Sequence, residues 1–305
     1  MRYRVWHRTT YTYDADVTDS LGIAYLTPRT GALQRVLSRE LTVSPATDEV
    51  RDDVDVHGNV ATFFQVVRPH RELVVRAESV VEVTAPVYDA ELLATPWEEA
   101  RPAARPDSPD AWEAWDGALP TALAAPGPEV REYVGESLTP GRPLGDVLTD
   151  LVRRVHADFA YRPGATTVTT SVAEVMAARA GVCQDFAHLL LAGLRAHGLA
   201  ARYVSGYLAT TPPPGRERLV GADATHAWIA VWAPGPAPAE PGGARGEGEW
   251  LMVDPTNDTW VDERYVSVAW GRDYGDVPPL KGVIYTEATS SSLAVAVDVA
   301  PVLEV

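Results

Sequence analysis

Cysteine occurs only once in this chain of 305 residues, and its scarcity excludes two common uses of the residue. Cys183 has no partner in the chain, so an internal disulfide is impossible. The sequence also lacks a C-x-x-C or H-x-x-x-H pair, the spacings that usually indicate a zinc site. We therefore expect no metal and no other cofactor.

Long apolar runs and clusters of basic residues are missing as well. The first seven residues, MRYRVWH, lack the apolar core of a signal peptide, and no segment is long enough to cross a bilayer. The 26 basic residues are outnumbered by 42 acidic ones and form no cluster suited to nucleic acid phosphates. These absences predict a cytoplasmic protein that binds neither nucleic acid nor membrane, and whose net charge of −16 serves solubility.

The surroundings of the single cysteine indicate a reactive thiol. The sequence GVCQDFAH, residues 181–188, leads from a glycine into a strongly apolar helical stretch. A cysteine in the first turn of such a helix lies among free backbone amides and partial positive charge, which both favour the thiolate. Free cysteine is also among the most buried residue types, so a structural role for Cys183 is the alternative.

Two later segments supply a candidate base and a carboxylate. THAWIAVW, residues 225–232, alternates as a strand, and WLMVDP, residues 250–255, is predicted to form a second strand that ends at its proline. Antiparallel pairing places the start of one strand opposite the end of the other, which brings His226 and Asp254 together. A histidine that takes the thiol proton and is held by a carboxylate activates a cysteine nucleophile. We predict a catalytic triad of Cys183, His226 and Asp254.

The chain order of these three residues, and the sequences around them, resemble the bacterial branch of the transglutaminase-like superfamily. Similarity extends to FAYRPG at 159–164 and to GRDYGDVPPL at 271–280. Residues before about 90, including DVHGN at 55–59, resemble the bacterial transglutaminase-like N-terminal domain. The resemblance implies a papain-like core, in which the nucleophile helix packs on an antiparallel sheet.

Strand signals dominate the first part of the chain. From Tyr3 to Tyr13 the residues alternate at period 2, and further strand-like runs follow as far as residue 83. Short strands separated by turn residues predict a sandwich, so we assign residues 1–87 to an N-terminal β-sandwich-like domain. The sequence HGN at 57–59 is a turn signal, and we expect its role to be structural.

Residues 88–128 differ in composition, being rich in Ala, Pro, Asp and Glu, which is typical of a linker. Tryptophans embedded in this stretch are expected to anchor it by packing, with the lining of a substrate cleft as the alternative. They are Trp97, Trp112 and Trp115.

The remaining residues, 129–305, are assigned to the catalytic core. Ser171 and the glutamate three residues later form a capping box for a helix that Gly181 is expected to stop. The next helix, residues 183–197, is apolar on most sides, which predicts a buried central helix. Helices followed by antiparallel strands are typical of an α+β fold.

Four residues near the triad have less certain uses. A helix turns by about 100° per residue, which carries Asp185 and His188 away from the thiol, so we expect neither to be the base. Gln184 directly follows the nucleophile and is a candidate substrate contact. Tyr161 occupies the position where the resemblance places an aromatic oxyanion donor, with a core tyrosine as the alternative. The backbone N–H of Cys183 is the first expected donor to the oxyanion.

These residues predict a thiol enzyme that attacks a peptide or protein amide and forms an acyl thioester. Hydrolysis needs nothing beyond the triad and is our first prediction, and acyl transfer to an amine is the alternative. The sequence has no acidic calcium loop of the animal transglutaminase kind, so we expect no calcium requirement.

Other readings of the same residues remain open. The chain could be a non-catalytic scaffold on the same fold, because fold does not fix function. The three triad residues could also hold a metal, although no local ligand pair supports this. The loop at 233–249, rich in Pro and Gly, is expected either to move over the cleft or to be a plain surface hairpin loop.

Overall fold

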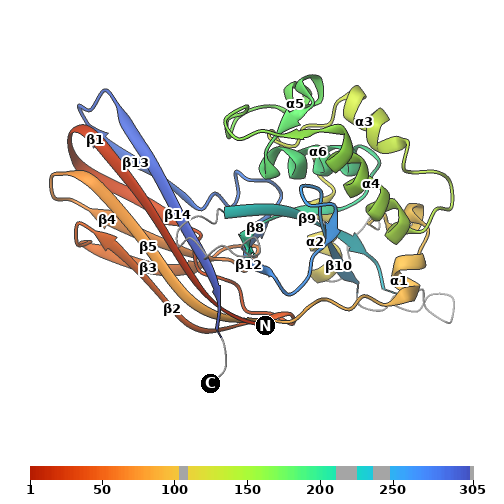
Figure 1. The fold of residues 1–305 in the computed structure, drawn as a ribbon, viewed down its shortest axis with the longest axis horizontal. Helices are drawn as coiled ribbons and strands as arrows, with labels where there is room; N and C mark the ends of the chain where they lie inside the picture. The colour runs from red at the N-terminus through yellow and green to blue at the C-terminus, as the bar shows by residue number, and fades with distance from the viewer. Residues whose placement is uncertain (103–108, 211–224, 236–247, 303–305) are drawn as a thin grey trace, which may run out of the picture.

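The computed structural model describes residues 1–102, 109–210, 225–235 and 248–302, and it places a long antiparallel sheet beside a core of helices and a second sheet (Figure 1). The elements in chain order are β1 (Arg2–Ala24), β2 (Gln34–Ser44), β3 (Glu49–Val54), β4 (Val60–Val66), β5 (His70–Val83), α1 (Ala90–Ala94), the 3-10 helix η1 (Trp97–Ala100), α2 (Pro109–Gly117), α3 (Pro128–Gly135), α4 (Leu144–Asp158), β6 (Ala160–Tyr161), α5 (Val172–Ala178), β7 (Ala180–Gly181), α6 (Cys183–Ala196), β8 (Ala201–Leu208), β9 (Thr225–Ala233), β10 (Glu249–Asp254), β11 (Thr259–Trp260), β12 (Tyr265–Gly271), β13 (Leu280–Thr286) and β14 (Ser291–Pro301).

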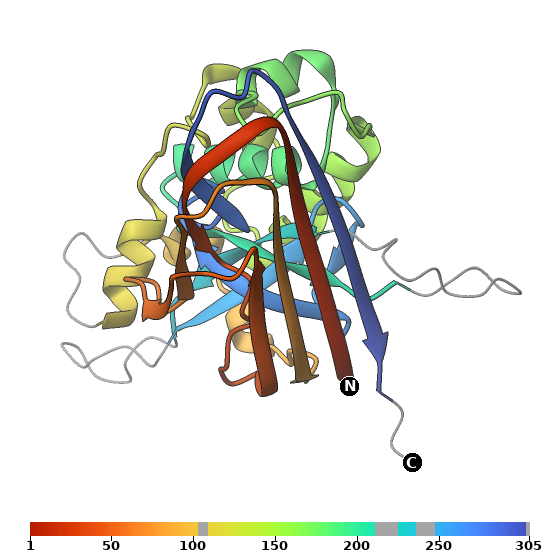
Figure 2. The ribbon, with the colours of Figure 1, turned by 90° about the vertical axis from the view of Figure 1, so that its left-hand side faces the viewer.

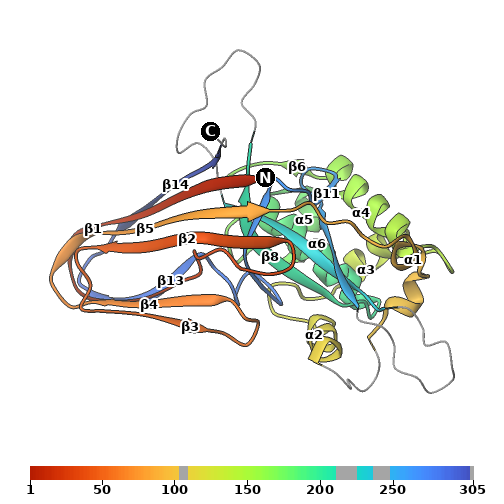
Figure 3. The ribbon, with the colours of Figure 1, turned by 90° about the horizontal axis from the view of Figure 1, so that it is seen from below.

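The N-terminal sheet has seven strands and is organised by one very long strand, β1. The first half of β1 pairs with β5 and β14, whereas its second half pairs with β4 and β13. Strand β2 extends the first layer beside β5, and β3 extends the second beside β4. The sheet is thus folded into two facing layers (Figure 3), which is the sandwich-like arrangement that the alternating sequence predicts.

Side-chain burial along β1 follows the predicted alternation. Tyr3, Val5 and Tyr13 point to the buried side, and exposed polar residues lie between them. Tyr13 packs between the layers with Phe64 and other apolar residues, while Tyr3 and Val5 join the buried cluster of the catalytic core. The N-terminal sheet is therefore packed directly against the core.

Two strands of the N-terminal sheet come from the far end of the chain. Residues 280–301 form β13 and β14, and both pair with β1 (Figure 2). The predicted division into 1–87, 88–128 and 129–305 does not anticipate this pairing, because it assigns residues 280–301 to the catalytic core. Strand pairing between segments so distant in sequence has no local signal.

The predicted linker contains α1, η1 and α2 in its described part. Trp97 is only 7% exposed, and its indole N–H donates to the Thr139 carbonyl at 3.0 Å, so it anchors this stretch as predicted. Trp112 and Trp115 are 57% and 37% exposed, and their ring centroids lie 5.7 Å apart on α2. Anchoring is therefore confirmed for Trp97 and is wrong for Trp112.

The catalytic core joins helices to a five-stranded antiparallel sheet of order β11-β10-β9-β8-β12. Helix α6 lies across β8 and β9 and packs on its other sides against α3 and α5 (Figure 1). Its leucines are fully buried, which confirms the prediction of a central helix. The structure is therefore the α+β, papain-like arrangement that the sequence predicts.

The start of α5 agrees with the prediction from the sequence, and its end does not. The capping box of Ser171 and Glu174 opens α5. Arg179, in a left-handed conformation with φ of 48°, ends α5 two residues before the predicted Gly181. Gly181 instead lies in β7, beside β6.

The described residues bear only in part on two predictions, which concern a membrane-spanning segment and the loop at 233–249. Within the described ranges, every helix is too short or too polar to cross a membrane. The predicted loop at 233–249 lies, apart from its ends, outside the described residues.

Candidate active site

Cys183 is the first residue of α6, as the sequence predicts. Its side chain is partly buried and packs against the main hydrophobic cluster, while the remainder of the residue stays open to solvent. At this position the backbone N–H has no acceptor within the helix, and the helix start carries partial positive charge. The thiol therefore lies where a negative charge is stabilised.

Asp185 fixes the chain that leads into α6. Its buried carboxylate accepts hydrogen bonds from the Val182 N–H at 2.7 Å and from the Thr166 hydroxyl at 2.6 Å. Burial raises the pKa of Asp185 and outweighs the two hydrogen bonds, which lower it. Asp185 is a structural acid, as expected.

His226 and Asp254 form a direct hydrogen bond at the ends of neighbouring strands. His226 Nε2 lies 2.7 Å from Asp254 Oδ2, where the carboxylate accepts, and Asp254 is fully buried. Cys183 lies close enough to the imidazole to raise its pKa. The structure thus brings together the three residues that the sequence proposed as a triad.

The register differs from the predicted one by two residues. The last pair between β10 and β9 is Val253 with Ile229, so continuation of the ladder places Asp254 opposite Trp228 and not opposite His226. The carboxylate therefore reaches His226 along a diagonal of the sheet. Trp228 lies opposite Asp254, and its ring centroid is 6.1 Å from that of His226.

Three further groups hold Asp254 in place. Its Oδ2 accepts from the Asn257 side-chain amide at 2.7 Å and from the Tyr265 hydroxyl at 2.8 Å, and its Oδ1 accepts from the Thr256 N–H at 2.8 Å. Sequence reasoning missed Asn257 and Tyr265. Asn257 follows Asp254 closely in the sequence DPTN and could have been identified as a turn residue. Tyr265 comes from β12, and nothing in the sequence indicates its contact with Asp254.

The hydrogen bonds set the charges of the pair. Burial opposes a charge on His226, but hydrogen bonds to Asp254 and Cys183 outweigh it and raise the pKa of the imidazole to about 10. Burial likewise acts to raise the pKa of Asp254, yet the hydrogen bond and the positive charge of His226 bring it below its usual range. The favoured state of His226 is an imidazolium paired with the Asp254 carboxylate.

His188 is excluded as the base by its surroundings. It is buried, and its Nε2 accepts from the Tyr274 N–H at 3.1 Å, on the side of α6 away from the thiol. Burial lowers its pKa to about 4, so the ring is neutral at physiological pH. The sequence-based expectation for His188 is confirmed.

Tyr161 and Gln184 occupy different surroundings. Tyr161 pairs with Gly181 between β6 and β7 and is 54% exposed, so the alternative of a core tyrosine is wrong. Burial and the charges of Cys183 and Asp254 raise its pKa, which places the phenol within electrostatic reach of the triad. The Gln184 side-chain amide donates to the Val168 carbonyl at 3.2 Å. The roles proposed for both residues in substrate binding stay predictions.

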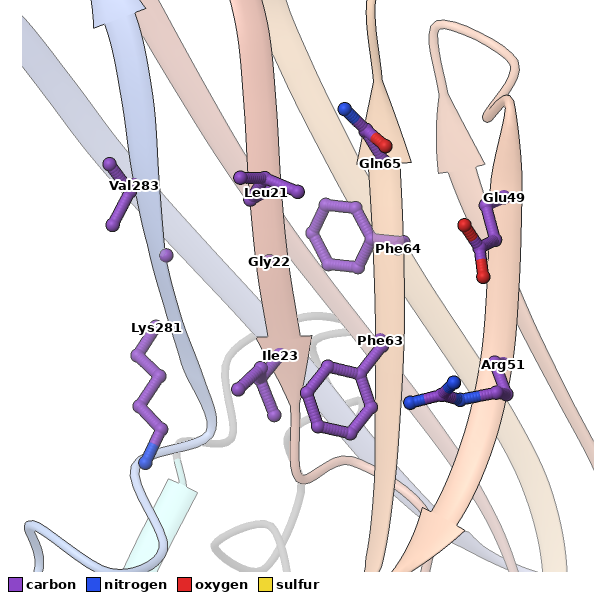
Figure 4. A pocket seen from close by; sticks show the side chains of 11 residues that line it. Leu21, Gly22, Ile23, Glu49, Arg51, Phe63, Phe64, Gln65, Lys281 and Val283 are labelled. Carbon is purple, nitrogen blue, oxygen red and sulfur yellow. The ribbon is translucent and has the colours of Figure 1, made fainter.

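A groove on the N-terminal sheet lies in another part of the molecule. It has a volume of about 550 Å³ and lies between β13, β1, β4 and β3, with Leu21, Ile23, Phe63 and Val283 along it and charged side chains at its rim (Figure 4). None of the described residues that line it belongs to the triad.

Two family models match the chain. Residues 3–82 match the bacterial transglutaminase-like N-terminal region, and residues 132–255 match the transglutaminase-like superfamily. The second range contains Cys183, His226 and Asp254.

Individual relatives agree with these models. An uncharacterized protein of Mycobacterium tuberculosis strain H37Rv is 49% identical over 303 residues, covering 98% of this chain and 93% of the relative. A protein-glutamine gamma-glutamyltransferase of Pseudomonas aeruginosa is 31% identical over 135 residues, covering 38% of this chain and 18% of that protein.

A solved structure shares the whole fold. A Cytophaga hutchinsonii protein described as a candidate cysteine protease superposes with a TM-score of 0.71 at 19% identity, covering 97% of this chain and 90% of that one. Similarity at this level of identity concerns the fold.

Proposed function

The chain belongs to the transglutaminase-like superfamily, and from that premise we propose that it is a cysteine-dependent enzyme that hydrolyses an amide or peptide bond through an acyl thioester. The observation that carries the proposal is the position of His226, which is hydrogen bonded to the buried Asp254 and whose pKa is raised by both Asp254 and Cys183. Loss of any of the three residues would have favoured a non-catalytic scaffold, and all three are present.

In the first half-reaction, Cys183 and the protonated His226 react as a thiolate–imidazolium pair, and the sulfur attacks the carbonyl carbon of the substrate. The C–N bond then breaks, and the proton held by His226 passes to the leaving amine. Asp254 stays ionised throughout, because its role is to orient the imidazole and stabilise its positive charge. The product of this half-reaction is an acyl thioester on Cys183 and a free amine.

In the second half-reaction, a water molecule attacks the thioester while His226 accepts a proton from it. The C–S bond breaks, the sulfur leaves as a thiolate beside the protonated His226, and a carboxylic acid is released. The two tetrahedral intermediates carry negative charge on oxygen, for which the Cys183 N–H is the first donor. We propose the phenol of Tyr161 as the second donor, because it is exposed and within electrostatic reach of the triad.

An amine in place of water gives the second candidate function, acyl transfer. The observation in its favour is the similarity to the Pseudomonas aeruginosa protein-glutamine gamma-glutamyltransferase. We place hydrolysis first because it requires no site for an amine and no exclusion of water. The proposed substrate in both cases is a peptide or protein amide.

Alkylation of Cys183 by iodoacetamide tests the thiol directly. Because the chain has one cysteine, a single adduct in the intact mass reports this residue alone. We expect fast labelling near neutral pH in the wild type and slow labelling in His226→Ala. His197→Ala is the control, because that histidine bonds to the Arg131 carbonyl away from the triad. Equal labelling in all three proteins would favour the scaffold.

The acyl acceptor is distinguished in a second experiment. A glutamine-containing peptide library is incubated with the enzyme, with and without a primary amine such as a biotinylated alkylamine. Release of ammonia with conversion of glutamine to glutamate, or cleavage of the peptide, identifies hydrolysis. Incorporation of the amine identifies transfer. Cys183→Ala is the blank for both readouts.

A further inference from the structure

Strand β12 is the edge strand of the core sheet, and the N-terminal domain holds its outer side. One edge of β12 pairs with β8. Along the other edge, two side-chain amides from the N-terminal domain form hydrogen bonds with the β12 backbone. They belong to Gln34 and Asn59.

Each side-chain amide both donates to and accepts from the backbone of one β12 residue, as a residue of a neighbouring strand does. Gln34 donates to the Ser267 carbonyl at 2.8 Å and accepts from the Ser267 N–H at 2.9 Å. Asn59 donates to the Trp270 carbonyl at 2.8 Å and accepts from the Trp270 N–H at 2.9 Å. Hydrogen bonds of this kind, made by buried amides, are costly to leave unmade.

Burial and stacking reinforce this contact. Asn59 is fully buried and Gln34 is 8% exposed. The Arg29 guanidinium lies 3.4 Å from the centroid of the Trp270 ring. The backbone N–H of Arg29 donates to the Ser267 carbonyl at 3.1 Å. The sequence HGN at 57–59, which was expected to be structural, is thus part of the contact that holds β12.

The same strand reaches the triad two residues earlier. Tyr265, the first residue of β12, is buried, and its hydroxyl donates to Asp254 Oδ2 at 2.8 Å. Its ring also packs against Trp228, with the centroids 5.2 Å apart. A single strand therefore bonds to the N-terminal domain at Ser267 and to the catalytic carboxylate at Tyr265.

We propose that the N-terminal sheet is a positioning device for the triad, in which Gln34 and Asn59 fix β12 and Tyr265 transmits that position to Asp254 and His226. This inference rests on the proposed function. Gln34, Asn59 and Tyr265 touch no reacting atom and are positioning residues. In this proposal the N-terminal domain positions the triad in addition to packing against the core.

Gln34→Met and Tyr265→Phe test the two ends of this connection. Each removes hydrogen-bonding groups and keeps most of the side-chain volume. Ser20→Ala is the matched control, because Ser20 is equally buried in the N-terminal sheet and bonds to His70 without touching β12. The readouts are the rate of Cys183 alkylation as a function of pH and the pKa of His226 by NMR, with its signal assigned from His226→Gln.

We expect each test variant to slow Cys183 alkylation near neutral pH by about tenfold to a hundredfold through misplacement of the base, with Ser20→Ala close to wild type. The double variant Gln34→Met/Tyr265→Phe should be no slower than the slower single variant, because both changes break one connection. A shift of the His226 pKa is expected in both single variants.

Additive effects in the double variant, or a Gln34→Met protein that behaves as Ser20→Ala does, would overturn the inference. If Gln34→Met does not fold, Gln34→Asn keeps the amide and withdraws it by one methylene, and the same comparisons apply. If Cys183 is unreactive in the wild type, the proposed enzyme function fails, and the NMR titration of His226 still decides whether β12 transmits the change.

Discussion

Asp254 shows how much of a catalytic residue's behaviour is decided by its neighbours. Four donors surround this carboxylate, and each is a different kind of group: an imidazole, an amide, a phenol and a backbone N–H. A buried carboxylate is costly unless its oxygens are satisfied. The same bonds that offset this cost also fix which nitrogen of His226 faces Cys183.

Replacing Asp254 by asparagine tests this arrangement with almost no change in volume. The amide cannot accept at both positions, so its NH2 group opposes one of the donors and the imidazole loses its orientation. We expect activity to fall by about 10⁴-fold, as for the equivalent change in a serine protease triad. Circular dichroism should show an unchanged fold. Activity within a few fold of wild type would contradict the assigned role.

Tyr161→Phe tests the second oxyanion donor. Removing a donor that acts only in the transition state should lower kcat by about 10²–10³-fold and leave KM nearly unchanged. Tyr285→Phe is the control, because that phenol is exposed on β13 outside the site. A change in KM with an unchanged kcat would assign Tyr161 to substrate binding instead.

At the scale of elements, the lead-in to α6 depends on a glycine. A Cβ atom added at Gly181 would lie 2.7 Å from Asp185 Oδ2 and 2.8 Å from Asp185 Cβ, which is too close for either atom. The carboxylate that caps the Val182 N–H occupies the space that any side chain at residue 181 would need.

Gly181→Ala should therefore displace Asp185 and loosen the start of the nucleophile helix. We expect the free energy of unfolding to fall by about 1–3 kcal/mol, the usual cost of overpacking, and Cys183 alkylation to slow. Gly31→Ala is the control, because no atom lies within 4 Å of a Cβ built there. Equal stability of the two variants in urea would show that the cap adjusts freely.

Local sequence patterns predicted the elements that carry the triad. They did not predict the pairings between elements that are distant in the sequence. The nucleophile helix, the strand with His226 and the strand with Asp254 follow from periodicity and turn residues near each other in the chain. The end of α5 at Arg179 was missed because a left-handed arginine has no sequence signal. Tyr265 was missed because its contact exists only once β12 has taken its place in the sheet.

For the whole molecule, His226, His7 and His188 have shifted pKa values that make its stability depend on pH. His226 keeps its proton in the folded state up to a pKa of about 10, whereas an unfolded histidine releases it near 6.5. Between those values the folded state binds more protons, so the free energy of unfolding falls as pH rises. His7 and His188, with pKa values lowered to about 4 by burial, cause it to fall as pH drops below 6.5.

We therefore expect maximum stability at about pH 6.5, measured by urea denaturation across a pH series. His226→Ala should remove most of the decline on the alkaline side and retain the decline on the acid side. A variant whose stability still falls steeply between pH 7 and pH 10 would show that another group is responsible.

The position of β13 and β14 has a consequence for the synthesis of this protein. Strand β1 leaves the ribosome well before residues 280–301, which complete its sheet. At about 5–20 residues per second, the delay is on the order of tens of seconds. During that time one side of β1 presents unpaired N–H and C=O groups, which are a template for strands of other chains. The newly made N-terminal sheet is therefore exposed to pairing with other chains until residues 280–301 have been made.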